Sequence, residues 1–127
     1  MNYWLLGAGV LSGITFAAHI FGGGPEILVP LQNGDMAAVP KAIWTVVWHG
    51  VSATILIGTV GLIFAAIKPG RMSGMVWCIC AQYTAFTALF IVYGLTKLQS
   101  LWIMPQWIAF SLIVALALAG MRGSNPR

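Results

Sequence analysis

The sequence predicts an all-α integral membrane protein with four transmembrane helices in an antiparallel bundle. Of its 127 residues, 60% are hydrophobic and 6% are charged, and the mean hydropathy is +0.93. Soluble domains carry about a quarter charged residues, so this chain has too few charges to cover a surface that faces water. A spanning helix needs about 20 apolar residues, which limits a chain of this length to about four crossings. We therefore expect a single transmembrane domain over residues 1–127.

Four apolar stretches define the expected spans, at residues 3–21, 42–67, 73–95 and 104–121. The first ends at Gly22-Gly23-Gly24-Pro25, because consecutive glycines followed by a proline do not favour an α-helix. The second ends at Lys68-Pro69-Gly70-Arg71, because a proline followed by a glycine also favours a turn over an α-helix. Ser73 is the expected N-cap of the third span. Pro105 fits the first turn of the fourth, where its missing N–H would have no partner.

The connection between the first two spans, residues 22–41, is expected to form a long loop outside the membrane. Adjacent helices need only a few residues to turn, so a connection of this length is typical of a functional loop. Residues 27–31 are too apolar to lie free in water. We therefore expect the loop to cover the mouth of the bundle, with Asp35 capping a short turn at residues 36–38.

The basic residues predict that both termini lie in the cytoplasm. In a four-span topology, the side that holds the termini carries Lys68, Arg71, Arg122 and Arg127. The other side carries Lys41 and Lys97 together with both acidic residues. Cytoplasmic segments of membrane proteins are enriched in Lys and Arg, so topology accounts for the net charge of +4. Six scattered basic residues form no patch, and we expect no nucleic-acid partner.

Two histidines are the strongest chemical signal in the sequence. His19 lies near the outer end of the first span and His49 near the outer end of the second, so both lie on one side of the membrane. Each belongs to a polar helical face, made of Ser12, Thr15 and His19 in the first span and of Thr45, His49, Ser52 and Thr59 in the second. Because polar groups in a bilayer turn toward the protein interior, we expect the two faces to meet.

These histidines leave three interpretations open. With Glu26 from the covering loop, His19 and His49 form a ligand set suited to zinc, iron or copper, or to a haem-like group. Asp35, Thr45 or Ser52 would then orient a histidine or replace a ligand. In the second interpretation, the histidines hydrogen-bond to each other, to Glu26 or to backbone carbonyls and only lock the helices together. In the third, they form a ligand pocket or a proton path.

The third span has a polar residue of its own, Gln82, near its middle. A buried amide in hydrocarbon needs a hydrogen-bond partner, so we expect a contact between helices, of the kind that Ser12 and Thr15 offer from the first span. Binding of a small ligand, such as a quinone or a lipid, is the alternative. Cys78 and Cys80 point about 200° apart on a helix, so we expect neither a disulfide nor shared metal binding.

Small residues at four-residue spacing predict close packing of the first two spans. Gly9 and Gly13 form such a ridge in the first span, and Gly50 and Gly58 form one in the second, opposite the His49 face. Small side chains let membrane helices approach closely. The second ridge needs a neighbour, which is another helix of the bundle, a second copy of the chain or a larger subunit.

A set of residues in the first half of the chain forms a further pattern. The run of His19, Gly22-Gly23, Glu26-Ile27, Pro30-Leu31 and Trp48-His49 resembles a family of small, uncharacterised four-span proteins of bacterial inner membranes. The resemblance extends to about Ser52 and implies a bacterial source and a multi-pass location in the inner membrane. It implies no activity.

Few residues of this sequence are suited to catalysis. Only two carboxylates are present, and no Ser or Cys has a base at a known motif spacing. We therefore expect a noncatalytic accessory or structural subunit that packs into a larger membrane complex or a homo-oligomer. The alternatives are a membrane protein with an outward-facing His19, Glu26 and His49 site for a metal or haem-like group, and a protein that binds a quinone or a lipid.

Overall fold

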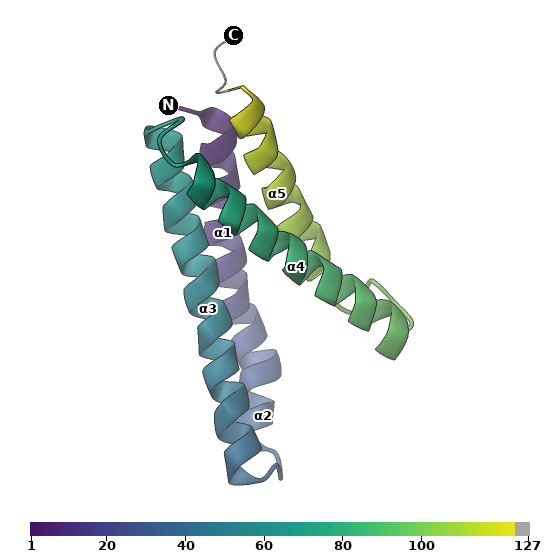
Figure 1. The fold of residues 1–127 in the computed structure, drawn as a ribbon. Coiled ribbons are helices and arrows are strands. Elements are labelled where there is room, and N and C mark those ends of the chain that lie inside the picture. The colour runs from purple at the N-terminus through teal and green to yellow at the C-terminus, as the bar shows by residue number, and fades with distance from the viewer. Residues whose placement is uncertain (124–127) are drawn as a thin grey trace.

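The computed structural model describes residues 1–123, which are helical throughout except for short connections (Figure 1). The elements, in chain order, are α1 (Tyr3–Ala18), the π-helix η1 (His19–Leu28), α2 (Val29–Asn33), α3 (Ala38–Ile67), α4 (Ser73–Lys97) and α5 (Gln106–Arg122). The described part of the chain contains no strand, so the predicted all-α class is confirmed.

Three of the helical segments are long and apolar enough to cross a membrane. They are Tyr3–Asn33 with 31 residues, Ala38–Ile67 with 30 and Ser73–Lys97 with 25. The fourth predicted span, at residues 104–121, is also an apolar helix, but α5 has only 17 residues. A helix of that length is at the lower limit for crossing the hydrocarbon of a bilayer.

The expected loop over residues 22–41 is wrong, because the chain stays helical through most of it. The run Gly22-Gly23-Gly24-Pro25 lies inside η1, and α2 follows without a break. In the wider π-helical turn, the N–H of Val29 donates to the carbonyl of Gly24, five residues back. Pro25 has no N–H to donate, and a wider turn leaves more room for its ring. Only residues 34–37 remain between α2 and α3.

Two predicted caps also differ from the structure. Met72 occupies the N-cap position of α4, so Ser73 is the first helical residue and not the cap. Asp35 is exposed, and no side chain caps α3 at Ala37. Both helices begin without a side-chain cap because packing of their long apolar bodies stabilises them far more than one cap does.

The helices form two antiparallel pairs that meet at one end of the molecule and diverge toward the other (Figure 1). The continuous helix α1–η1–α2 runs beside α3, and α4 runs beside α5. Near the chain's beginning, α1 also packs against α5. Asn2 joins three helices there. Its Nδ2 donates to the Gly120 carbonyl (2.7 Å), its backbone N–H donates to the Ala66 carbonyl (2.8 Å), and its Oδ1 accepts from the N–H of Trp4 (3.1 Å).

Glycines allow the closest approaches between helices. A β-carbon at Gly9 on α1 would lie 2.7 Å from a side-chain carbon of Ile63 on α3. A β-carbon at Gly120 on α5 would lie 2.8 Å from a side-chain carbon of Leu5. The buried core around these contacts is made of Leu5, Ala8, Ile55, Leu62, Ala65, Ala66, Val76, Cys80, Tyr83, Phe110, Ile113 and Ala117. The helices are thus held by small-residue packing along their shared end.

Candidate functional site

A buried cluster of three hydroxyl groups joins α1, α3 and α4. Ser12 Oγ lies 2.7 Å from the phenol oxygen of Tyr83 and 2.8 Å from Oγ1 of Thr59. Ser12 is 0% exposed, Tyr83 1% and Thr59 9%. The backbone carbonyl of Ile55 is a shared acceptor, 2.9 Å from Thr59 Oγ1 and 3.3 Å from the Tyr83 oxygen. We call these three side chains the hydroxyl cluster.

The protons of the hydroxyl cluster have one complete arrangement. Tyr83 donates to the Ile55 carbonyl, Ser12 donates to Tyr83, and Thr59 donates to Ser12. This arrangement satisfies all three hydroxyl groups, and the described residues contain no buried side-chain nitrogen or oxygen without a partner. A fully satisfied polar network of this kind fixes how three helices pack.

A second polar contact joins η1 to α3 nearer the divergent end of the molecule. His19 Nε2 lies 3.1 Å from Oγ of Ser52, and the Ser52 hydroxyl lies 2.9 Å from the Trp48 carbonyl. A hydroxyl has one proton, so when Ser52 donates to Trp48 it accepts from His19. The imidazole then carries its proton on Nε2. Its ring also stacks on the Trp48 indole, with centroids 4.1 Å apart and planes at 18°.

The Trp48 indole is held from a second side by η1. A β-carbon at Gly23 would lie 2.9 Å from a ring carbon of Trp48, so only a glycine leaves room for the indole there. Trp48 therefore packs between the His19 ring and the glycine-rich part of the π-helix. This contact connects the irregular helical turn directly to α3.

The proposed metal ligands do not come together in the described part of the chain. Glu26, Asp35 and His49 are all exposed, and residues 1–123 hold no group of three His, Cys, Asp or Glu side chains that could bind a metal ion. His49 is separated from Ser52 by about 60° around α3. Ser52 and Thr59 face α1 because they are seven residues apart, whereas His49 faces outward.

The other predicted polar contacts are mostly local. Thr15 donates to the Leu11 carbonyl (2.9 Å), and Thr45 donates to the Lys41 carbonyl (3.0 Å), each within its own helix. Gln82 is exposed on α4, where it borders a cavity of about 250 Å³ between α3 and α4 that Thr54, Gly58 and Tyr83 also line.

The four glycines expected to pack helices differ in their surroundings. Gly9 meets Ile63, and a β-carbon at Gly13 would be in contact with Thr59 at 3.4 Å. Gly58 faces Tyr83 so closely that a β-carbon there would overlap the phenol ring, 2.9 Å from Cζ. Gly50 has no atom within 4 Å of such a β-carbon. The ridge on α3 therefore serves α4 at Gly58 and faces open space at Gly50.

Tyr83 is the residue of the hydroxyl cluster that the sequence analysis misses. It stands beside Gln82, whose amide draws attention as the polar group of its span, whereas a tyrosine ring is apolar apart from one oxygen. The sequence contains one signal for the position of Tyr83, which is Gly58. A glycine in a predicted packing ridge leaves space for a large side chain from a neighbouring helix.

The geometry of the His19–Ser52 contact favours a structural role. The distance between Nε2 and Oγ matches that of a base and a nucleophile, but Ser52 is 7% exposed and its proton is directed at Trp48. No protein-family model matches this sequence, and the comparisons with curated proteins and with solved structures found no match. The hydroxyl cluster and the His19–Trp48–Ser52 contact are therefore assigned from geometry alone.

Proposed function

We propose that the chain is a noncatalytic four-span protein of the bacterial inner membrane that packs as an accessory or structural subunit in a larger membrane assembly or a homo-oligomer. The observation that carries the proposal is the hairpin made by α1–η1–α2 and α3. This hairpin is longer than a bilayer requires, and its far end is covered with apolar side chains.

Helix α3 is longer than the hydrocarbon of a bilayer is thick. Its 30 residues extend about 45 Å, whereas the hydrocarbon of a bilayer is about 30 Å thick. A typical helix tilt of about 20° shortens the projection only to about 42 Å. The end of the hairpin around residues 34–37 thus lies about 12 Å beyond the hydrocarbon, if the chain's other end is at the opposite interface.

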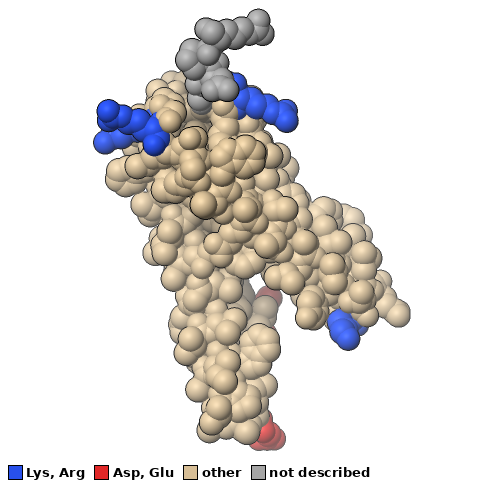
Figure 2. Space-filling model, in the orientation of Figure 1, with Lys and Arg blue, Asp and Glu red and all other residues tan. Residues whose placement is uncertain are grey.

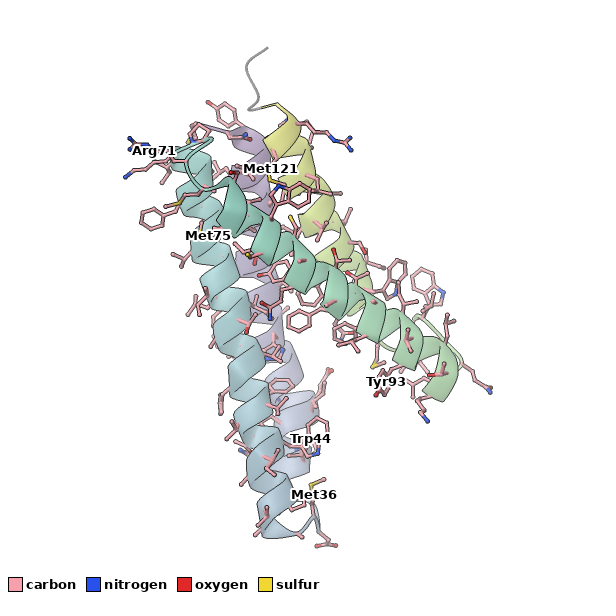
Figure 3. The ribbon with its side chains drawn as sticks, viewed as in Figure 1. Met36, Trp44, Arg71, Met75, Tyr93 and Met121 are labelled. Carbon is pink, nitrogen blue, oxygen red and sulfur yellow. The ribbon has the colours of Figure 1, made fainter. Side chains whose placement is uncertain are left out.

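The far end of the hairpin is too apolar for water. Its large apolar side chains that are at least 40% exposed include Ile27, Val29, Met36, Val39, Ile43 and Trp44. Trp44 and Met36 are drawn on this end in Figure 3. Extended apolar surfaces outside the hydrocarbon mark sites of contact with protein. A neighbouring subunit would bury these side chains.

The proposed topology places both termini in the cytoplasm. The chain begins at the end where α5 finishes, and Lys68, Arg71 and Arg122 belong to this same end (Figure 2). Arg127, the fourth basic residue of the predicted cytoplasmic side, lies outside the described residues. The excess of basic residues at the end with the termini supports this orientation.

The test is the assembly state of the full chain in mild detergent. Light scattering should give a protein mass well above the 13.6 kDa of one chain, either as a defined homo-oligomer or with a stoichiometric partner. The double variant Val39→Gln/Ile43→Gln should dissociate the assembly, whereas the matched control Val60→Gln/Phe64→Gln, on the same helix away from the hairpin end, should not. A monomeric wild-type chain would contradict the proposal.

A further inference from the structure

The cavity between α3 and α4 lies beside the close contact of Gly58 with Tyr83, and its volume is about 250 Å³. Gly58 and Tyr83 line it and are buried, whereas Ile57, Cys78 and Gln82 line it and are exposed. Sites for small molecules begin at about 300 Å³, so a cavity of this size suits a single ring rather than a whole lipid.

Both polar residues at the edge of this cavity lie inside the hydrocarbon in the proposed topology. Gln82 follows Ser73, the first residue of α4, by nine positions, and Thr54 precedes Ile67, the last residue of α3, by thirteen. At 1.5 Å per residue, the two side chains are at most about 14 Å and about 20 Å from the interface at the α3–α4 connection. The hydrocarbon is about 30 Å thick, so both lie among acyl chains, where no water is available as a partner.

Gln82 brings an amide without a partner to the cavity. Its side chain makes no hydrogen bond to another residue of the described chain, 1–123. The amide has two N–H donors and one carbonyl acceptor, and acyl chains can pair with none of them. On the α3 side, the Thr54 hydroxyl donates to the Gly50 carbonyl (2.9 Å), so its oxygen can still accept a hydrogen bond. A ligand in the cavity that carries a hydrogen-bond acceptor would pair with the Gln82 amide.

The remaining lining residues favour an uncharged ligand with a flat ring. The described residues that line the cavity include no charged side chain, so a phosphate or a carboxylate would have no counter-charge there. Met75, Cys78 and Tyr83 supply sulfur and aromatic groups, which make favourable contacts with rings. Met75 is labelled on α4 in Figure 3. A neutral ring that dissolves in hydrocarbon therefore matches both the depth and the chemistry of the cavity.

We propose that this cavity binds the ring of an isoprenoid quinone, with a ring carbonyl accepting a hydrogen bond from the Gln82 amide and the tail extending into the bilayer. A quinone is uncharged, dissolves in hydrocarbon and carries carbonyl acceptors on a flat ring. The proposal rests on the membrane location of the proposed function and is independent of assembly. Binding needs no catalytic residue, so it is compatible with a noncatalytic subunit.

The experiment is a titration of full-length protein, purified free of quinone in mild detergent, with decylubiquinone, read by native mass spectrometry. One decylubiquinone should bind per chain, and decylbenzene, which has the same tail but no carbonyl, should bind more weakly. Gln82→Leu should weaken decylubiquinone binding about tenfold, which corresponds to about 1.4 kcal/mol. Gln106→Leu is the matched control, because Gln106 is exposed on α5 and does not line the cavity, and it should leave binding unchanged.

A second variant tests the cavity without removing the amide. Cys78→Phe fills the edge of the cavity and should also weaken decylubiquinone binding. Thr84→Phe, at an exposed position of the same helix that does not line the cavity, should not. Thermal unfolding of each variant checks that it still folds.

Equal binding of decylubiquinone and decylbenzene, or equal effects of Gln82→Leu and Gln106→Leu, would overturn the proposal. Equally tight binding of dioctanoylglycerol would show a site for any lipid carbonyl and would overturn it as well. A dimer that depends on Gln82 and binds no quinone would show that a second helix is the partner of the amide, which also overturns it. Assembly state is measured separately, so a monomer that binds the quinone contradicts only the proposed function.

Discussion

The phenol oxygen of Tyr83 lies 2.7 Å from the hydroxyl oxygen of Ser12, although the two residues are 71 positions apart in the sequence. This contact holds α4 against α1 at the point where α4 crosses α3. Gly58 makes it possible, because any side chain at that position would occupy the space of the phenol ring. The hydroxyl cluster therefore lies where three helices meet.

Removal of the Tyr83 hydroxyl should weaken the fold without changing its shape. In Tyr83→Phe, Ser12 and the Ile55 carbonyl each lose a partner, and the free energy of unfolding should fall by about 0.6–2 kcal/mol. Denaturant unfolding in detergent micelles measures this. The matched control is Tyr93→Phe on the exposed part of α4, which should change stability by less than about 0.5 kcal/mol. Equal effects at both tyrosines would argue against the hydroxyl cluster.

A methyl group at Gly58 should separate α3 from α4. We expect Gly58→Ala to destabilise the protein by about 1–3 kcal/mol, because the β-carbon overlaps the Tyr83 ring and forces a shift. Gly50→Ala, where the same methyl group meets nothing within 4 Å, should be close to neutral. A double-mutant cycle of Gly58→Ala with Tyr83→Phe would show whether the two effects are coupled, as direct contact requires. Additive effects of the two substitutions would show that Gly58 and Tyr83 are not coupled and would contradict this prediction.

The two histidines should differ sharply. His19→Ala removes a hydrogen bond and a stacked ring, and should cost about 1–2 kcal/mol of stability. His49 is exposed, so His49→Ala should have an effect below about 0.5 kcal/mol. Thermal unfolding of both variants in one detergent provides the comparison. If His49→Ala were the more damaging change, the assignment of Ser52 as the partner of His19 would be wrong.

The separation of His19, Glu26 and His49 predicts how much metal the protein binds. Protein purified without chelator should hold well below one transition-metal ion per chain, as determined by elemental analysis, because no third ligand accompanies any two of these side chains in residues 1–123. A stoichiometric metal or haem that is lost in both His19→Ala and His49→Ala would refute this prediction. It would also show that the two helices rearrange on binding.

The four-span topology predicts the side of the membrane on which each connection is labelled. In a chain with Cys78 and Cys80 replaced by alanine, Asp35→Cys and Lys97→Cys should react with an impermeant maleimide added to intact cells. Arg71→Cys and Gly123→Cys should react only after the cells are opened. Reaction of Gly123→Cys from outside would show that α5, with its 17 residues, does not cross the membrane.

The loop predicted over residues 22–41 is wrong because it rests on local residue preferences alone. Glycine and proline at residues 22–25 are unfavourable in an α-helix, and this tendency predicts a loop. In an apolar environment, however, each backbone N–H and C=O needs a partner, so continued helical hydrogen bonding is favoured over an irregular loop. The chain meets both conditions by widening into a π-helix, which the spacing of residues does not reveal.

The sequence by itself determined the class of the protein, because composition and the length of apolar stretches decide whether a chain can be solvated by water. It also identified the polar faces of the first two spans, since helical periodicity depends only on local geometry. The tertiary structure alone decided which polar residues meet. His19 contacts Ser52 and not His49, because an offset of about 60° turns His49 away from the interface. Tyr83 joins Ser12 and Thr59 because α3 and α4 cross at Gly58, which places the Tyr83 hydroxyl at the interface with α1. A crossing point depends on packing between helices rather than on the sequence of any one helix.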